Sequence, residues 1–164
     1  MSTDMKKIDP KAVQRLRTET NAGVMDCKRA LEDAEGDYEK AKGLLKERGL
    51  AAVAKKSGRE AKEGVIASYI HAGGRKGALV EIASETDFVA RSAEFQKLAQ
   101  EVAMQVAAMS PKTVDELLEQ AYIRDSSKTI KDLVTTLAAS VGENVSVRRI
   151  QRFAIGEADG EADA

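Results

Sequence analysis

The sequence is poor in aromatic side chains and has almost no cysteine or histidine. Its 164 residues include no tryptophan, one cysteine and one histidine, and only 4% are aromatic. The single cysteine, Cys27, excludes an internal disulfide and a cysteine-based zinc cage, so we expect no metal site and a reducing compartment. The single histidine, His71, is the only base available to a Ser/His/Asp or Cys/His relay. We therefore expect neither an enzyme nor a cofactor.

Long apolar runs and an excess of positive charge are also missing. No run approaches the roughly 18 apolar residues that a membrane span needs, and the start, MSTDMKKIDP, has no apolar signal core. These absences predict a cytoplasmic protein with no membrane partner. The formal net charge is -1, which disfavours broad nucleic-acid binding because phosphate recognition needs clustered lysine and arginine. We expect protein partners and no direct contact with nucleic acid.

What the sequence does contain is enough apolar residues, 43%, to bury a core. Its first fifty residues or so show three amphipathic patterns, typical of a small bundle of helices. Asp9 and Pro10 predict an N-cap and a first helical residue, while Gly36 and Gly49 are expected to end the second and third helices. The next segment, AAVAKKSGREAKE (51–63), has no sustained apolar stripe and predicts a linker that can be helical in part.

The rest of the chain alternates between strand and helix patterns. GVIASYIHAGGRKGALVEIAS predicts a hairpin of two antiparallel strands, and a long amphipathic helix should follow from Ser92. Thr113 and Glu116 have capping-box spacing before a short helix, and a further helix is expected to begin near Ser127. NVSVRRIQRFAI predicts a third strand. This order favours an α+β fold with a helical module at 1–54, a core domain at 55–156 and a disordered acidic tail at 157–164.

One short motif, ASETDFVAR, places an aromatic residue at a joint between the hairpin and the long helix. Thr86 or Asp87 could cap a short helical turn while Phe88 packs beneath the hairpin. Alternatively, Phe88 could protrude as a wedge, because a strand on one side and a helix on the other would hold it rigidly. The four residues TDFV do not by themselves decide between these interpretations.

Other motifs carry weaker signals. GGRKG lacks the spacing of a phosphate-binding loop and is better explained as a hairpin turn. Arg148, Arg149 and Arg152 on the last strand could contact RNA phosphates, although arginines flanked by acidic residues usually form a solvated face. These three residues are the basis of an alternative hypothesis for the function, an RNA-binding α+β module.

Several longer stretches resemble bacterial elongation factor Ts, in order and over nearly the whole chain. They are LRTETNAGVMDCKRALEDAEGD, REAKEGVIASYIHAGGRKGALVEIASETDFVAR, DSSKTIKDL and GENVSVRRI. The resemblance implies a ubiquitin-associated-like module of three helices, followed by a small antiparallel sheet of about three strands packed with helices. It also implies a guanine-nucleotide exchange factor that binds elongation factor Tu in its GDP-bound and nucleotide-free forms.

The resemblance assigns roles to particular residues. Thr86, Asp87, Phe88 and Val89 match the family element that pushes between helices of the partner GTPase near its magnesium ion. Phe88 would be the wedge and Asp87 its polar companion. A second contact surface falls on the turn after the first helix, at Arg17, Val24 and Met25.

The sequence also departs from the family pattern. Asn21 stands where a glycine is usual, and Val24 stands where a methionine is usual. Longer members carry a second copy of the core subdomain and a helical hairpin, which this chain lacks. A sheet of three strands would leave an apolar face uncovered, and shorter relatives solve this by pairing, so we expect a homodimer.

Overall fold

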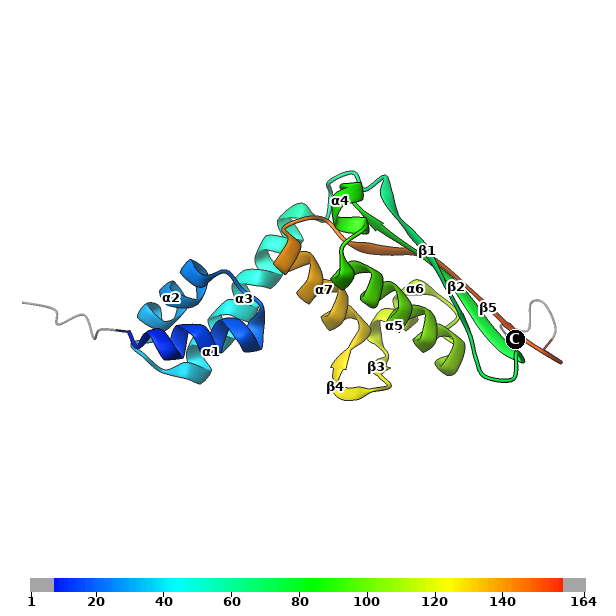
Figure 1. Cartoon of the computed structure of the whole chain (residues 1–164), viewed down its shortest axis with the longest axis horizontal. Helices are drawn as coiled ribbons and strands as arrows, with labels where there is room; N and C mark the ends of the chain where they lie inside the picture. Colours follow the sequence, from blue (N-terminus) through cyan, green and yellow to red (C-terminus); the bar gives the residue numbers. More distant parts are fainter. Residues whose placement is uncertain (1–7, 158–164) are drawn as a thin grey trace, which may run out of the picture. The chain divides into compact units, whose positions relative to one another are not determined.

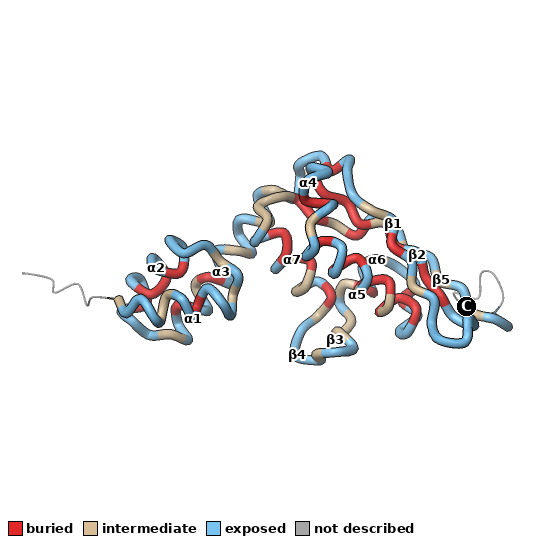
Figure 2. Tube along the Cα trace, in the orientation of Figure 1, coloured by how far each residue is buried: buried red, intermediate tan, exposed pale blue. Residues whose placement is uncertain are grey.

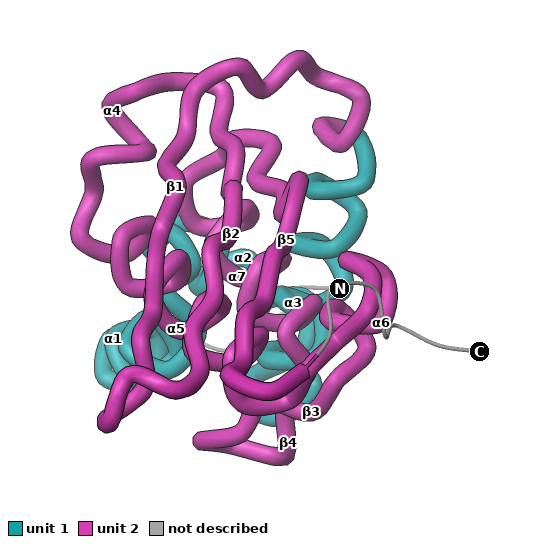
Figure 3. The backbone as a smooth tube through the Cα atoms, turned by 90° about the vertical axis from the view of Figure 1, so that its right-hand side faces the viewer, with its two compact units in different colours: residues 1–55 teal, residues 56–164 magenta. Residues whose placement is uncertain are grey.

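The computed structural model describes residues 8–157, which form two compact units divided between Lys55 and Lys56. Figure 3 colours the two units separately, as residues 1–55 and 56–164. The acidic segment expected to be disordered lies outside the described residues except for Glu157. No helix in the described part of the chain is long and apolar enough to cross a membrane.

Unit 1 consists of three helices around a small apolar core. They are α1 (Pro10–Thr20), α2 (Val24–Asp33) and the greater part of α3 (Tyr38–Lys56). Asp9 caps α1 by accepting a hydrogen bond from the backbone N–H of Lys11, and Pro10 is the first helical residue. Their inward faces, visible as the buried stretches in Figure 2, contribute Leu16, Cys27, Ala30, Leu31, Ala34, Ala41 and Leu45.

The third helix is longer than its sequence predicted. Gly49 was expected to end it, but α3 continues through Gly49 to Lys56. A glycine inside a helix costs about 1 kcal/mol relative to alanine. The alanines and lysines that follow favour helix strongly enough to continue past it.

Unit 2 is built on a three-stranded antiparallel sheet with strand order β1-β2-β5. The strands are β1 (Glu63–Ile70), β2 (Lys76–Ser84) and β5 (Ser146–Ala154). Alternate β2 residues, among them Ala78, Val80 and Ile82, are buried because side chains alternate between the two faces of a strand. Figures 1 and 3 show α5 (Ala93–Met109) and α7 (Ile130–Val141) on one side of this sheet. The structure therefore shows the α+β fold that the sequence predicted.

Two short helices and a second, small sheet complete unit 2. The helices are α4 (Asp87–Ala90) and α6 (Val114–Glu119), and the small sheet pairs β3 (Ala121–Tyr122) with β4 (Asp125–Thr129). The sequence pattern missed this small sheet and was wrong to begin a helix near Ser127. Thr129 is the N-cap of α7 and forms a capping box with Asp132, so the helix begins at Ile130 and the residues before it are extended.

Candidate functional site

The TDFV motif folds as a single helical turn between β2 and α5. Its helix, α4, has four residues, and Thr86 is the N-cap. The Thr86 hydroxyl accepts a hydrogen bond from the backbone N–H of Val89 at 3.3 Å. We call residues 85–90 the Phe88 turn.

The side chains of this turn divide between solvent and core. The Phe88 side chain protrudes, with 82% of its surface exposed, whereas Val89 and Ala90 are buried. Asp87 is exposed and forms an ion pair with Arg91 at 2.9 Å. The ring does not pack beneath the hairpin, so of the two local interpretations the structure shows the protruding one. Val89 lies inside, where it anchors the turn and is not exposed to a partner.

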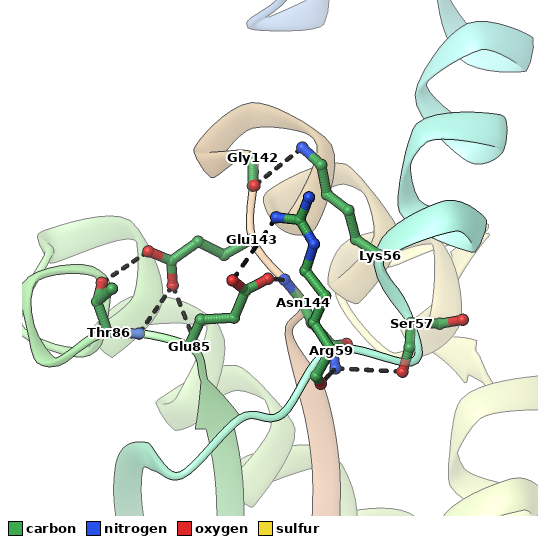
Figure 4. A network of polar contacts seen from close by, with 8 residues as sticks. All are labelled: Lys56, Ser57, Arg59, Glu85, Thr86, Gly142, Glu143 and Asn144. Carbon is green, nitrogen blue, oxygen red and sulfur yellow. Dashed lines mark hydrogen bonds and ion pairs between the residues drawn. The ribbon is translucent and has the colours of Figure 1, made fainter.

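Glu143 lies between α7 and β5 and forms hydrogen bonds with the start of the Phe88 turn (Figure 4). One carboxylate oxygen accepts hydrogen bonds from the backbone N–H groups of Glu85 and Thr86, both at 3.1 Å. The other oxygen accepts from the Thr86 hydroxyl at 2.6 Å. A carboxylate that receives several donors forms charge-assisted hydrogen bonds, which are shorter and stronger than neutral ones.

The α7–β5 connection also donates a hydrogen bond to the Phe88 turn. The Glu85 carboxylate accepts a hydrogen bond from the backbone N–H of Asn144 at 2.7 Å and lies 3.7 Å from the Arg59 guanidinium. The buried Asn144 side chain donates to the carbonyls of Ser57 and Arg59. The Phe88 turn, the α7–β5 connection and residues 57–59 thus form one hydrogen-bonded network, drawn in Figure 4.

The second set of predicted contact residues lies in unit 1. Arg17 is exposed in the last turn of α1, and Val24 and Met25 begin α2 with 46% and 59% of their surfaces exposed. Asn21 ends α1 with a left-handed backbone, φ 56°. That conformation favours glycine but tolerates asparagine, which explains how Asn21 can replace the glycine that the family resemblance implies.

The other chemical candidates are engaged within their own chain. His71 lies in the β1–β2 turn, just beyond the end of β1, and its Nδ1 is 3.1 Å from the Tyr69 hydroxyl. Among the residues that the structure describes, the His71 ring thus pairs with a phenol and not with the carboxylate that orients the histidine of a Ser/His/Asp relay. Cys27 is buried, and that burial raises the pKa of its thiol. Within residues 8–157, no group of three or more histidine, cysteine, aspartate or glutamate residues could hold a metal ion.

The three arginines of β5 also form hydrogen bonds or ion pairs within the chain. Arg148 donates to the carbonyl of Ala61, and Arg149 forms an ion pair with Glu81. Arg152 donates to the carbonyl of Ala107 at 3.0 Å and pairs with Glu157. Contact with RNA phosphates would have to compete with these bonds, so the arrangement gives the RNA-binding alternative no support.

The sequence pattern predicts the Phe88 turn but not the residue that holds it. Glu143 is 57 residues from Thr86 along the chain, and no local pattern connects them. One signal was present: GEN follows the end of α7, and a glutamate directly after a glycine C-cap is well placed to bond across to a neighbouring segment.

Comparison with known proteins identifies close relatives. Residues 85–161 match the family model described as elongation factor TS. The chain is 42% identical over 198 residues to "Elongation factor Ts" of Anaeromyxobacter dehalogenans (strain 2CP-1), covering 93% of this chain and 90% of the relative. It is 42% identical over 195 residues to "Elongation factor Ts" of Caldanaerobacter subterraneus, covering 92% and 98%. It is 41% identical over 197 residues to "Elongation factor Ts, chloroplastic" of Guillardia theta, covering 92% and 90%.

The alignments also show that this chain is shorter than those relatives. The aligned span of 198 residues exceeds the 164 residues of the whole chain. The relatives therefore carry additional residues within the matched region.

Proposed function

The chain belongs to the elongation factor Ts family of translation factors, and from this premise we propose that it is the guanine-nucleotide exchange factor of elongation factor Tu in the cytoplasm. In this proposal it binds the GDP-bound GTPase, promotes loss of GDP and stays bound to the nucleotide-free form. The observation that carries the proposal is the exposed Phe88 ring on a turn that is anchored at both ends.

The Phe88 turn is suited to act as a wedge. Its ring enters a partner at little entropic cost because the turn is already ordered. In the proposed mechanism, Phe88 and Asp87 enter between helices of the GTPase and displace the side chains that hold its magnesium ion. GDP then loses the ion that bridges its phosphates to the protein and dissociates faster. The chain makes and breaks no covalent bond in this process, so it is not a catalyst of a chemical reaction.

Phe88 alone cannot supply the whole effect. Accelerating GDP release by about four orders of magnitude requires lowering the barrier by roughly 5.5 kcal/mol. Burying one phenylalanine contributes about 1.5 to 3 kcal/mol. The remainder must come from docking, for which unit 1 offers Arg17, Val24 and Met25. Because the coupling between ligands is reciprocal, GDP must weaken the binding of this protein as much as this protein weakens the binding of GDP.

The uncovered face of the sheet supports a second part of the proposal, that two copies associate. Four apolar side chains with 46% to 68% of their surfaces exposed lie on the side of the sheet opposite α5: Ile66, Ile70, Leu79 and Phe153. We call them the apolar outer face. Ile70 and Phe153 flank Gly77 in one cross-strand row, so the glycine between them leaves both apolar side chains open to a second sheet.

The direct test is release of labelled GDP from purified elongation factor Tu, with and without this protein. We expect release to accelerate by several orders of magnitude at saturating concentrations, with the same acceleration for GTP release. A release rate that does not depend on the concentration of this protein would refute the proposed function.

A further inference from the structure

We propose that Glu143 is the positioning residue of the exchange wedge, holding the Phe88 turn in the geometry that inserts into the GTPase. This inference rests on the exchange function proposed above and adds to it a residue outside the TDFV motif. Its evidence is the set of three hydrogen bonds that the Glu143 carboxylate receives from the Phe88 turn.

The Phe88 turn needs support from outside itself. Helix α4 has four residues, and a single helical turn is unstable alone because nucleation fixes several residues for one hydrogen bond. Burial of Val89 and Ala90 anchors the end that leads into α5. At the entering end Thr86 and Asp87 are exposed, and the buried Ser84 before them donates a hydrogen bond to the Thr86 carbonyl at 2.9 Å. Polar contacts must therefore hold that end, and Glu143 provides three of them.

The Glu143 carboxylate also orients the helix cap. The Thr86 hydroxyl has one proton, which it donates to Glu143. Its lone pairs are then directed to the N–H of Val89, which it caps at 3.3 Å. Without Glu143 the hydroxyl could rotate and donate elsewhere. A single side chain thus fixes both the backbone before α4 and the cap that starts it.

Glu143 is itself held rigidly. It follows Gly142, whose left-handed backbone (φ 72°) ends α7, and the Gly142 carbonyl accepts a hydrogen bond from Lys56 at 2.9 Å. The next residue, Asn144, is fixed by the Glu85 carboxylate and by the carbonyls of Ser57 and Arg59. A carboxylate on a fixed backbone can define the position of the segment it binds, which a mobile surface glutamate cannot do.

The test compares Glu143→Ala with Glu143→Gln and with a matched control, Glu119→Ala. Alanine removes all three acceptor contacts. Glutamine keeps one oxygen for the two backbone N–H groups, and its amide can donate to the Thr86 hydroxyl, so it should rescue most of the effect. Glu119 forms only an exposed ion pair with Lys131 at 3.8 Å, and such pairs contribute little to stability.

We expect Glu143→Ala to lower the maximal rate of stimulated GDP release by about tenfold, since small misplacements of positioned groups are costly. The concentration giving half of that rate should change far less. In the Phe88→Ala background, Glu143→Ala should cause no further loss, because it acts through Phe88. By hydrogen exchange, the amides of Glu85, Thr86 and Val89 should lose protection while those in the middle of α5 keep theirs.

Two results would overturn the inference. One is full exchange activity of Glu143→Ala. The other is that Glu143→Ala lowers the rate of GDP release by the same factor in the unaltered protein and in the Phe88→Ala variant. If Glu143→Ala unfolds, Glu143→Asp gives the same test, since it keeps the carboxylate but draws it back from the Phe88 turn by one methylene. Failure of the exchange function is distinguishable, because the unaltered protein would then not stimulate release at all.

Discussion

At the scale of single residues, Phe88 is where the chain departs from ordinary folding preferences. Large aromatic side chains usually stabilise a protein by being buried, yet this ring contributes almost no buried surface to its own fold. Its neighbours provide the stability of the turn: Val89 through burial and Thr86 through its bonds to Glu143. Because other residues stabilise the turn, we expect that Phe88 can be replaced without loss of structure. Its role in nucleotide exchange can then be measured separately from stability.

We predict that Phe88→Ala and Met25→Ala impair exchange in different ways. Phe88→Ala should lower the maximal rate of GDP release at least tenfold while retaining binding to the GTPase, because the ring acts in the step that opens the nucleotide site. Met25→Ala should instead raise the concentration needed for half-maximal stimulation, because Met25 is expected to contribute to docking. Stopped-flow titrations separate the two effects. Unchanged GDP release with Phe88→Ala would refute the wedge role.

Another residue-scale prediction concerns Tyr122, whose phenol hydrogen bonds to Glu101. Burial, followed by this bond, raises the pKa of Tyr122 from 10.0 to about 12. The raised pKa means that the folded state favours the protonated phenol. Its contribution to stability is fully present below pH 10 and is lost as the pH rises from 10 to about 12.

Replacing Tyr122 by phenylalanine should therefore remove this part of the loss of stability at alkaline pH. We expect Tyr122→Phe to be less stable than the unaltered protein at neutral pH by about 1 kcal/mol. The gap should narrow between pH 10 and 12. Urea unfolding followed by circular dichroism at several pH values measures both quantities. A gap that is constant across this range would contradict the assignment.

At the scale of elements, local sequence signals predicted most boundaries of helices and strands, because caps and turns are formed by residues close together in the chain. Asp9 with Pro10, and Thr113 with Glu116, predicted helix starts that the structure shows. The turn between β1 and β2 contains Gly73 and Gly74, both with positive φ, as expected of a hairpin. In each case the deciding interaction joins residues only a few positions apart.

Elements held by distant contacts were missed. Residues 121–129 form a small hairpin whose sequence contains no strong strand pattern, and its position depends on the buried side chain of Gln105 in α5. The Gln105 amide donates to the carbonyl of Ala121 and to the side chain of Gln120, and it accepts from the N–H of Ile123. Glu143 was missed for the same reason. Neither interaction can be predicted from sequence spacing alone.

This hairpin gives an element-scale prediction. Gln105→Leu keeps the volume of the side chain but leaves the Ile123 N–H and the Ala121 carbonyl without their partner. We expect a loss of about 2 kcal/mol in the free energy of unfolding, because Gln105 makes several hydrogen bonds to the hairpin and each contributes roughly 0.5 to 1.5 kcal/mol. Gln100→Leu is the matched control, since Gln100 is exposed on the same helix. Equal urea midpoints for the two variants would show that the hairpin does not depend on Gln105.

At the scale of the whole molecule, the chain carries its two candidate contact surfaces in different units. Val24 and Met25 belong to unit 1, and Phe88 belongs to unit 2. Separate surfaces suit the proposed division between docking and wedging, since each can be altered without disturbing the fold of the other. The apolar outer face of the sheet is a third surface, and neither proposed contact with the GTPase uses it.

The last prediction is that this apolar outer face joins two copies of the chain. Light scattering at micromolar concentration should give the mass of a dimer. Leu79→Glu should give a monomer, because it places a charge on the central strand where pairing would remove it from water. Ile123→Glu, which alters an exposed apolar residue in the turn between β3 and β4, should remain dimeric. If the unaltered protein has the mass of a single chain, or if both variants keep the dimer, the apolar outer face is not the interface.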